Sequence, residues 1–206
     1  MINKYIKKDA SQTIILLHGT GGDETDLIPL GEFIDSNASL LGIRGNVLEN
    51  GMTRFFKRLS FGVFDQENLK IEAKNLYQFI LKSSETLSFD LNKVTILGYS
   101  NGANILAYMM MHYQMPIKLA IMLHPMVPSN ERPTVNNYDT YALMTAGTQD
   151  TMVPIKQTLS LKDMFDGMLL KTELKQFESG HQLTKEEYVF IKNWYNKQNV
   201  KKEGIS

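Results

Sequence analysis

The sequence contains no cysteine in its 206 residues. This absence excludes disulfide bonds, thiolate metal sites and a cysteine nucleophile. The chain also has no excess charge, because 22 Lys and Arg side chains balance 22 Asp and Glu side chains. A neutral chain gives no electrostatic reason to bind nucleic acid or an anionic membrane. We therefore expect neither of these as a partner.

Apolar runs long enough to enter a membrane are missing as well. Residues 1–10, MINKYIKKDA, lack the apolar segment of a signal peptide. The longest uncharged stretch, residues 94–117, holds serine, asparagine, histidine and glutamine side chains that a bilayer span does not readily tolerate. We interpret this stretch as a buried strand followed by a buried helix. A cytoplasmic protein without stable membrane association is the expectation.

Short apolar runs alternate with longer helical patterns along the chain. The candidate strands are residues 13–17, 40–43, 93–97, 119–123, 141–145 and 171–177. The candidate helices are residues 65–83, 102–113, 155–168 and 184–198. The last helix begins with TKEE, a capping box with Thr184 at the N-cap and Glu187 at N3. This alternation predicts an α/β fold with a doubly wound, mostly parallel sheet, in a single domain over residues 1–206 without a separate lid domain.

The motif GYSNG, residues 98–102, follows one of these candidate strands and precedes a candidate helix. It fits the nucleophile elbow G-x-S-x-G, in which a tight turn projects the serine hydroxyl from the sheet edge. Glycines flank the serine because side chains there would collide with neighbouring backbone. Ser100 is therefore the candidate nucleophile, with a role as a simple helix N-cap as the alternative.

A serine nucleophile needs a base, and a histidine base needs an acid that orients it. Asp150 follows the candidate strand 141–145, and His181 follows the candidate strand 171–177. The order Ser100, Asp150, His181 is the chain order of α/β-hydrolases, and all three are expected at one edge of the sheet. These residues form the predicted catalytic set.

The segment TIILLHGTGGDE, residues 13–24, ends a strand in a glycine-bearing loop. It is neither a dinucleotide fingerprint nor a phosphate-binding P-loop, because the required third glycine and the G-K-[ST] ending are absent. We expect this loop to supply one donor of an oxyanion hole, the Thr20 N–H, with the Asn101 N–H as the other. His18 is interpreted as a residue that orders the loop. His124 ends a strand, and the sequence leaves two interpretations open: it packs in the core or it lines the site.

Aromatic and methionine side chains are candidates for a substrate pocket. Residues 44–64 follow a strand and are expected to overhang the active edge. We predict pocket walls from Phe55, Phe56, Met126 and Met152, and the alternative is ordinary core packing. Phe61 and Phe64 belong to the same aromatic group. Arg44, Arg54 and Arg58 are expected on the surface, and recognition of an anion is the alternative. The histidine spacing fits no known metal motif, so a metal is not expected.

The segments LLHGTGGDETDLIPL, RGNVLENGMTRFF, LGYSNGANI, AGTQDTMVPI and SGHQLT run through nearly the whole chain. Together they resemble the carboxylesterase/phospholipase family of α/β-hydrolases, relatives of the acyl-protein thioesterases, and within it the hydrolases of bacterial quinone-resistance operons. The resemblance implies an α/β-hydrolase fold and a cofactor-free ester hydrolase with Ser100, Asp150 and His181 as triad. It also implies Thr20 and Asn101 as oxyanion positions.

One departure from the family pattern bears on the substrate. The acyl-protein thioesterases tend to show GFSQGG where this chain has GYSNGA, which changes the groove beside the nucleophile and argues against long acyl chains. We therefore expect a serine carboxylesterase for small esters, as a monomer or homodimer. The alternatives are an acyl-thioesterase or lysophospholipase, and a non-catalytic ligand sensor on the same fold.

Overall fold

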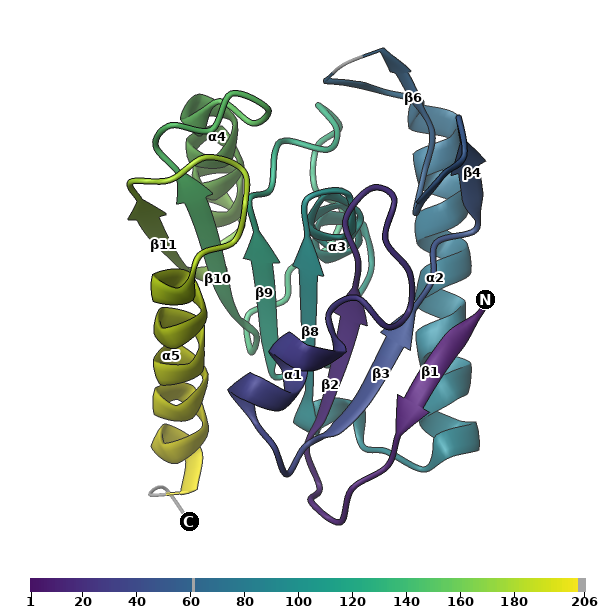
Figure 1. The fold of residues 1–206 in the computed structure, drawn as a ribbon, viewed down its shortest axis with the longest axis vertical. Coiled ribbons are helices and arrows are strands. Elements are labelled where there is room, and N and C mark those ends of the chain that lie inside the picture. Colours follow the sequence, from purple (N-terminus) through teal and green to yellow (C-terminus); the bar gives the residue numbers. More distant parts are fainter. Residues whose placement is uncertain (61, 204–206) are drawn as a thin grey trace.

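A central sheet organises the protein in a computed structural model that describes residues 1–60 and 62–203 (Figure 1). In spatial order its strands are β1 (Asn3–Ile6), β3 (Ser39–Ile43), β2 (Thr13–Leu17), β8 (Val94–Tyr99), β9 (Leu119–Leu123), β10 (Tyr141–Gly147) and β11 (Lys171–Phe177). All neighbours pair in parallel except β1, which is antiparallel to β3. The predicted, mostly parallel sheet is confirmed. The sequence pattern missed β1, a short and partly exposed edge strand.

Helices cover both faces of this sheet. One face packs against α1 (Ile28–Ile34) and α5 (Lys185–Glu203). The other packs against α2 (Gln66–Leu87), α3 (Asn101–His112) and α4 (Ile155–Gly167) (Figure 1). Strand β2 shows why the strands are apolar throughout, because Ile14 and Leu16 enter one core cluster while Ile15 and Leu17 enter the other. The doubly wound architecture follows from this two-sided burial.

The predicted helices are present with shifted ends. Helix α2 begins after Asp65, whose carboxylate caps it by accepting a hydrogen bond from the Asn68 N–H at 3.0 Å, and it ends at Leu87 rather than near residue 83. A 3₁₀ turn, η1 (Leu91–Lys93), precedes β8, so that strand begins at Val94. Helix α1 was not predicted, because its short segment shows too little periodicity.

Two small hairpins lie between β3 and α2. Strands β4 (Val47–Glu49) and β5 (Met52–Arg54) form one, and β6 (Arg58–Ser60) and β7 (Val63–Phe64) form the other. Figure 1 shows them beyond the carboxyl end of β3, beside α2. This is the edge over which residues 44–64 were predicted to lie. Phe61 is outside the described residues.

Within residues 1–60 and 62–203, no helix is both long and apolar enough to span a bilayer. The uncharged stretch 94–117 instead contains β8 and α3, as predicted.

Candidate active site

Three side chains meet where parallel strands end. Ser100 follows β8, Asp150 follows β10 and His181 follows β11. His181 Nε2 lies 2.9 Å from Ser100 Oγ, and His181 Nδ1 lies 2.7 Å from Asp150 Oδ2. The arrangement is a hydrogen-bonded chain from a hydroxyl through an imidazole to a carboxylate, and it can pass a proton away from the hydroxyl.

The turn at Ser100 explains the glycines around it. Ser100 has φ 51° and ψ −110°, a strained backbone for a residue with a side chain, and its N–H donates to Leu123 O at 2.9 Å. A Cβ at Gly98 would lie 2.4 Å from Gly102 O, and a Cβ at Gly102 would lie 2.1 Å from Leu17 O. Only glycine fits either position, so the motif is required by the packing of strand, turn and helix.

Asp150 is held from both sides. Its Oδ1 accepts hydrogen bonds from the Met152 and Val153 N–H groups, each at 2.8 Å. Its Oδ2 faces both His181 and His124. Burial opposes its charge, but the hydrogen bonds from Val153 and the two histidines outweigh burial and hold its pKa below the ordinary value. Asp150 is therefore a fixed carboxylate that orients His181.

A second histidine lies behind this chain. The His124 side chain is fully buried, with Nδ1 3.1 Å from Asp150 Oδ2 and Nε2 3.3 Å from Glu187 Oε2. Each ring nitrogen faces a carboxylate, and both nitrogens carry a proton when the two carboxylates are ionised. Burial disfavours that charge, yet the hydrogen bonds and attraction of Glu187 and Asp150 prevail and raise the pKa of His124. We infer an imidazolium between two buried carboxylates.

Tyr99 positions the loop that carries His181. Its hydroxyl donates to the His181 carbonyl at 2.9 Å, and the two rings lie 5.5 Å apart. Burial, with smaller contributions from Asp150 and Glu187, raises the pKa of Tyr99 to about 12, so it remains a neutral donor. The loop position of His181 therefore depends on a residue from the elbow motif itself.

The glycine-bearing loop lies against the same site. Thr20 lines the cavity beside Ser100, and Asn101 is the first residue of α3. Within the described chain, neither backbone N–H donates to another group, so both are free to bind an oxyanion. His18 orders the loop, since its Nδ1 contacts Gly19 O at 2.6 Å and its Nε2 accepts from the Gly45 N–H at 3.0 Å. Burial lowers the pKa of His18, which suits this neutral role.

The cavity around Ser100 and His181 is small, about 50 Å³. Its wall includes Met126 and Met152, as the sequence predicted. Phe55 and Phe56 are fully buried in the core cluster beside α2 and α3 and line none of the described pockets. The core-packing alternative is the correct one for these two rings, because the segment between the two hairpins places both in the core. Phe64 is the aromatic residue at the wall.

Two arginines also line this cavity. Arg54, expected on the surface, is 4% exposed, and its Nη1 donates to Thr20 Oγ1 at 2.8 Å. Arg58 is 30% exposed, and its Nε donates to Glu49 at 2.9 Å. The prediction was wrong for Arg54, because the β4–β5 hairpin folds it under the glycine-bearing loop. Arg44 is only partly exposed and pairs with Glu24.

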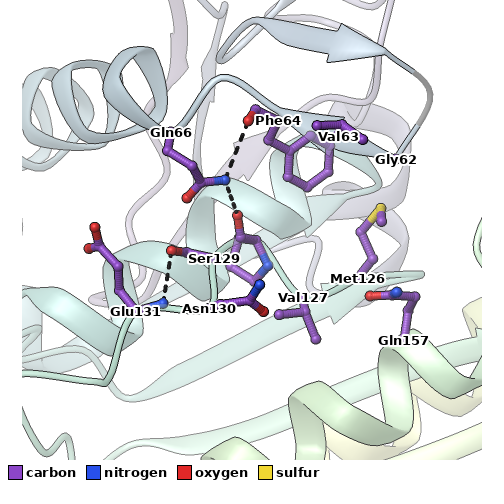
Figure 2. A pocket seen from close by; sticks show the side chains of 11 residues that line it. Gly62, Val63, Phe64, Gln66, Met126, Val127, Ser129, Asn130, Glu131 and Gln157 are labelled. Carbon is purple, nitrogen blue, oxygen red and sulfur yellow. Dashed lines mark hydrogen bonds between the residues drawn. The ribbon is translucent and has the colours of Figure 1, made fainter.

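A larger groove adjoins the cavity (Figure 2). It has a volume of about 600 Å³ and shares Gly62, Phe64 and Met126 with the smaller cavity. Figure 2 shows the Gln66 amide between two backbone carbonyls at its rim, those of Phe64 at 3.5 Å and Pro128 at 3.1 Å. The groove gives space to substrate groups that the small cavity cannot hold.

The ligand atoms of His124, Asp150 and His181 lie within 4.8 Å of one another, close enough to hold a metal ion. The same atoms form the hydrogen-bonded chain. A cation there would have to replace the protons that both Nδ1 atoms share with Asp150. Metal binding and the Ser100–His181–Asp150 chain are therefore mutually exclusive uses of these residues.

Sequence reasoning missed the role of Glu187, and it named Arg54 as a surface residue with anion recognition only as the alternative. Glu187 has the position of a capping-box residue, and its N–H does donate to Thr184 Oγ1 at 3.2 Å. Its carboxylate, however, faces His124. Because the capping box already explained a glutamate at position 187, nothing in the sequence indicated a second contact for its carboxylate.

Comparisons with known proteins place these features in a family context. The family model described as Phospholipase/Carboxylesterase matches residues 4–199. A protein of Bacillus subtilis (strain 168) with the hydrolase name MhqD is 42% identical over 93% of this chain and 96% of its own length. The carboxylesterase structure from Bacillus cereus is similar with a TM-score of 0.92 and 40% identity, covering 95% of this chain and 93% of the other. A carboxylesterase structure from Mesorhizobium loti gives a TM-score of 0.87 at 26% identity, with 92% and 90% covered.

Proposed function

The chain belongs to the phospholipase/carboxylesterase family and has the α/β-hydrolase fold, and from this premise we propose that it is a serine carboxylesterase for small esters. The preferred substrates are esters with short acyl or aromatic groups. The observation that carries the proposal is the hydrogen-bonded chain Ser100–His181–Asp150 beside a cavity of about 50 Å³. A small cavity favours a small acyl group.

In this mechanism Ser100 Oγ attacks the ester carbonyl while His181 Nε2 takes the hydroxyl proton. The tetrahedral intermediate then breaks its bond to the alcohol oxygen, and His181 returns the proton to the leaving alcohol. Asp150 keeps the imidazole in position and stabilises its charged form. Water, deprotonated by His181, next hydrolyses the acyl-enzyme, releases the acid and restores the Ser100 hydroxyl.

Backbone donors stabilise the charge that develops on the carbonyl oxygen. The free N–H groups of Thr20 and Asn101 are the proposed oxyanion hole. One such donor contributes about 2.7–4 kcal/mol to transition-state stabilisation in comparable enzymes. Arg54 supports this arrangement through its hydrogen bond to Thr20 Oγ1.

The test is hydrolysis of a p-nitrophenyl ester series from acetate to palmitate, with Ser100→Ala as the matched control. We expect kcat/KM to be highest for the short esters and Ser100→Ala to remove nearly all activity. Equal inactivity of both proteins across the series would contradict an enzyme and favour a ligand sensor. Trapping of the acyl group on Ser100, seen as a mass increase, would identify the nucleophile directly.

The groove of about 600 Å³ favours one second candidate, an acyl-thioesterase or lysophospholipase. Its volume is large enough for a long acyl chain, whereas the departure GYSNGA argues for smaller groups. The same ester series separates the two, because a maximum at palmitate would support this second candidate.

The proposal extends to the cellular setting. We propose a cytoplasmic enzyme that needs no cofactor and acts as a monomer or homodimer. The absence of cysteine is compatible with a reducing compartment. A role in quinone resistance rests on the sequence resemblance alone. Growth of a deletion strain in the presence of a quinone, with and without a plasmid copy, tests that role.

A further inference from the structure

The wall of the small cavity carries cationic side chains. Its ionisable residues are Arg54, Arg58 and His181, and no acidic side chain lines it among the described residues. Both arginines come from the hairpin region, Arg54 at the end of β5 and Arg58 at the start of β6. They therefore belong to the same cavity as Ser100.

The charge of these arginines is only partly neutralised. Glu49 is the carboxylate that both contact, with Oε2 at 2.9 Å from Arg58 Nε and 3.7 Å from Arg54 Nε. Two guanidinium groups against one carboxylate leave one positive charge in excess. An arginine stays charged in proteins, and burying a charge without a full counter-charge is costly. Burial and then Arg58 lower the pKa of Arg54, which reflects the same missing negative charge.

Arg54 also retains capacity to donate. A guanidinium has five N–H donors. Within the described chain, its hydrogen bonds run from Nε to Phe56 O at 3.1 Å and from Nη1 to Thr20 Oγ1 at 2.8 Å. Guanidinium groups match the flat, two-oxygen shape of a carboxylate better than any other side chain does.

We propose that Arg54 and Arg58 bind a carboxylate of the substrate, so that the preferred substrates are small esters that carry a free carboxylate near the reacting carbonyl. This inference rests on the proposed esterase function and names its substrate class. A carboxylate is favoured over a bulkier phosphate because the cavity measures only about 50 Å³. The reacting carbonyl lies beside Ser100 in the cavity, and the alcohol group of the ester extends into the adjoining groove past Phe64 and Met126 (Figure 2).

The test compares two esters of the same shape and different charge. Monomethyl succinate ends in a carboxylate, and methyl 4-methylpentanoate ends in an isopropyl group of similar shape. Acid release is titrated at constant pH, and p-nitrophenyl acetate reports separately whether the enzyme is active. We expect kcat/KM for the anionic ester to exceed that for the neutral ester at least about tenfold, since charge-assisted hydrogen bonds are the strong ones.

Arg58 is the residue to change, because Arg54 also holds Thr20. Arg58→Gln should remove most of the preference, Arg58→Lys should retain part of it, and higher salt should reduce it. Lys57→Gln removes the same charge from an exposed neighbour outside the cavity and should keep the preference.

Equal kcat/KM for the two esters in the wild type would overturn the inference, as would an unchanged ratio in Arg58→Gln. Failure of the esterase proposal looks different, because p-nitrophenyl acetate would then not be hydrolysed at all. A preference for the neutral ester also contradicts the carboxylate site while leaving the esterase proposal intact.

Discussion

His181 and His124 contact the same oxygen of Asp150, but their surroundings differ. The His181 side chain is 13% exposed and faces a hydroxyl on its far side. The His124 side chain is 0% exposed and faces a second carboxylate, Glu187. A histidine that gains and loses a proton needs one ring nitrogen beside a group that can give or take that proton. A histidine between two carboxylates keeps both of its ring protons. Burial and the group on the far side of the ring, rather than residue type, separate His181, the proposed base, from His124, the inferred buried cation.

The largest expected effect comes from removing the exchanging histidine. His181→Ala should lower kcat by more than about 10⁴-fold, because the Ser100 hydroxyl loses its base. The variant should lose less stability than His124→Asn does, since the His181 side chain is partly exposed and His124 is fully buried. Ester hydrolysis and urea unfolding check the two statements. A large loss of stability with residual activity would remove the distinction between the two histidines.

The reverse pattern is expected for the buried histidine. His124→Asn leaves Glu187 and Asp150 without the cation between them, and breaking a buried ion pair costs about 3–5 kcal/mol. Asparagine suits the backbone, because His124 has φ 52° and asparagine tolerates positive φ. Urea unfolding measures the loss, and kcat should fall far less than in His181→Ala.

The pH dependence of that loss sharpens the comparison. The pKa of His124 is raised in the folded protein, so its stabilisation is complete below the unfolded value of about 6.5 and disappears as pH rises through the folded value. Above about pH 6.5, where the carboxylates are already ionised, the difference in unfolding free energy between wild type and His124→Asn should therefore shrink as pH rises. Tyr99 stays neutral over this range, which leaves Asp150, Glu187 and His181 as the ionisable groups around His124. A difference that grows with pH would contradict an imidazolium.

The smallest effect tests the other contact of Glu187. Thr184→Ala removes the hydroxyl that accepts the Glu187 N–H and should cost about 1 kcal/mol, as lost N-caps do. Because the carboxylate side of Glu187 is untouched, the pH dependence of stability should match that of the wild type. A changed pH dependence would show that the cap also positions the carboxylate.

The sequence predicted those residues whose positions are set by short local motifs. The elbow glycines, the strand-end positions of Asp150 and His181, and the alternation of strands and helices are all visible in short segments. Contacts between distant segments were not visible. Glu187 lies 63 residues from His124 along the chain, and Arg54 lies 34 from Thr20. Phe55 and Phe56 were misassigned for the same reason, since an aromatic pair looks alike in a core and in a pocket wall.

The two hairpins between β3 and α2 have a consequence for how this protein can change. Each hairpin pairs with itself, and within the described residues neither shares a ladder with the central sheet. They nevertheless supply Arg54, Arg58 and Phe64 to the cavity. Insertions and substitutions in exposed positions of residues 47–64 therefore alter recognition without breaking a hydrogen bond of the sheet that carries Ser100. The central sheet holds Ser100 while the hairpins hold Arg54, Arg58 and Phe64, so directed evolution can vary the cavity wall in this segment and leave the sheet unchanged.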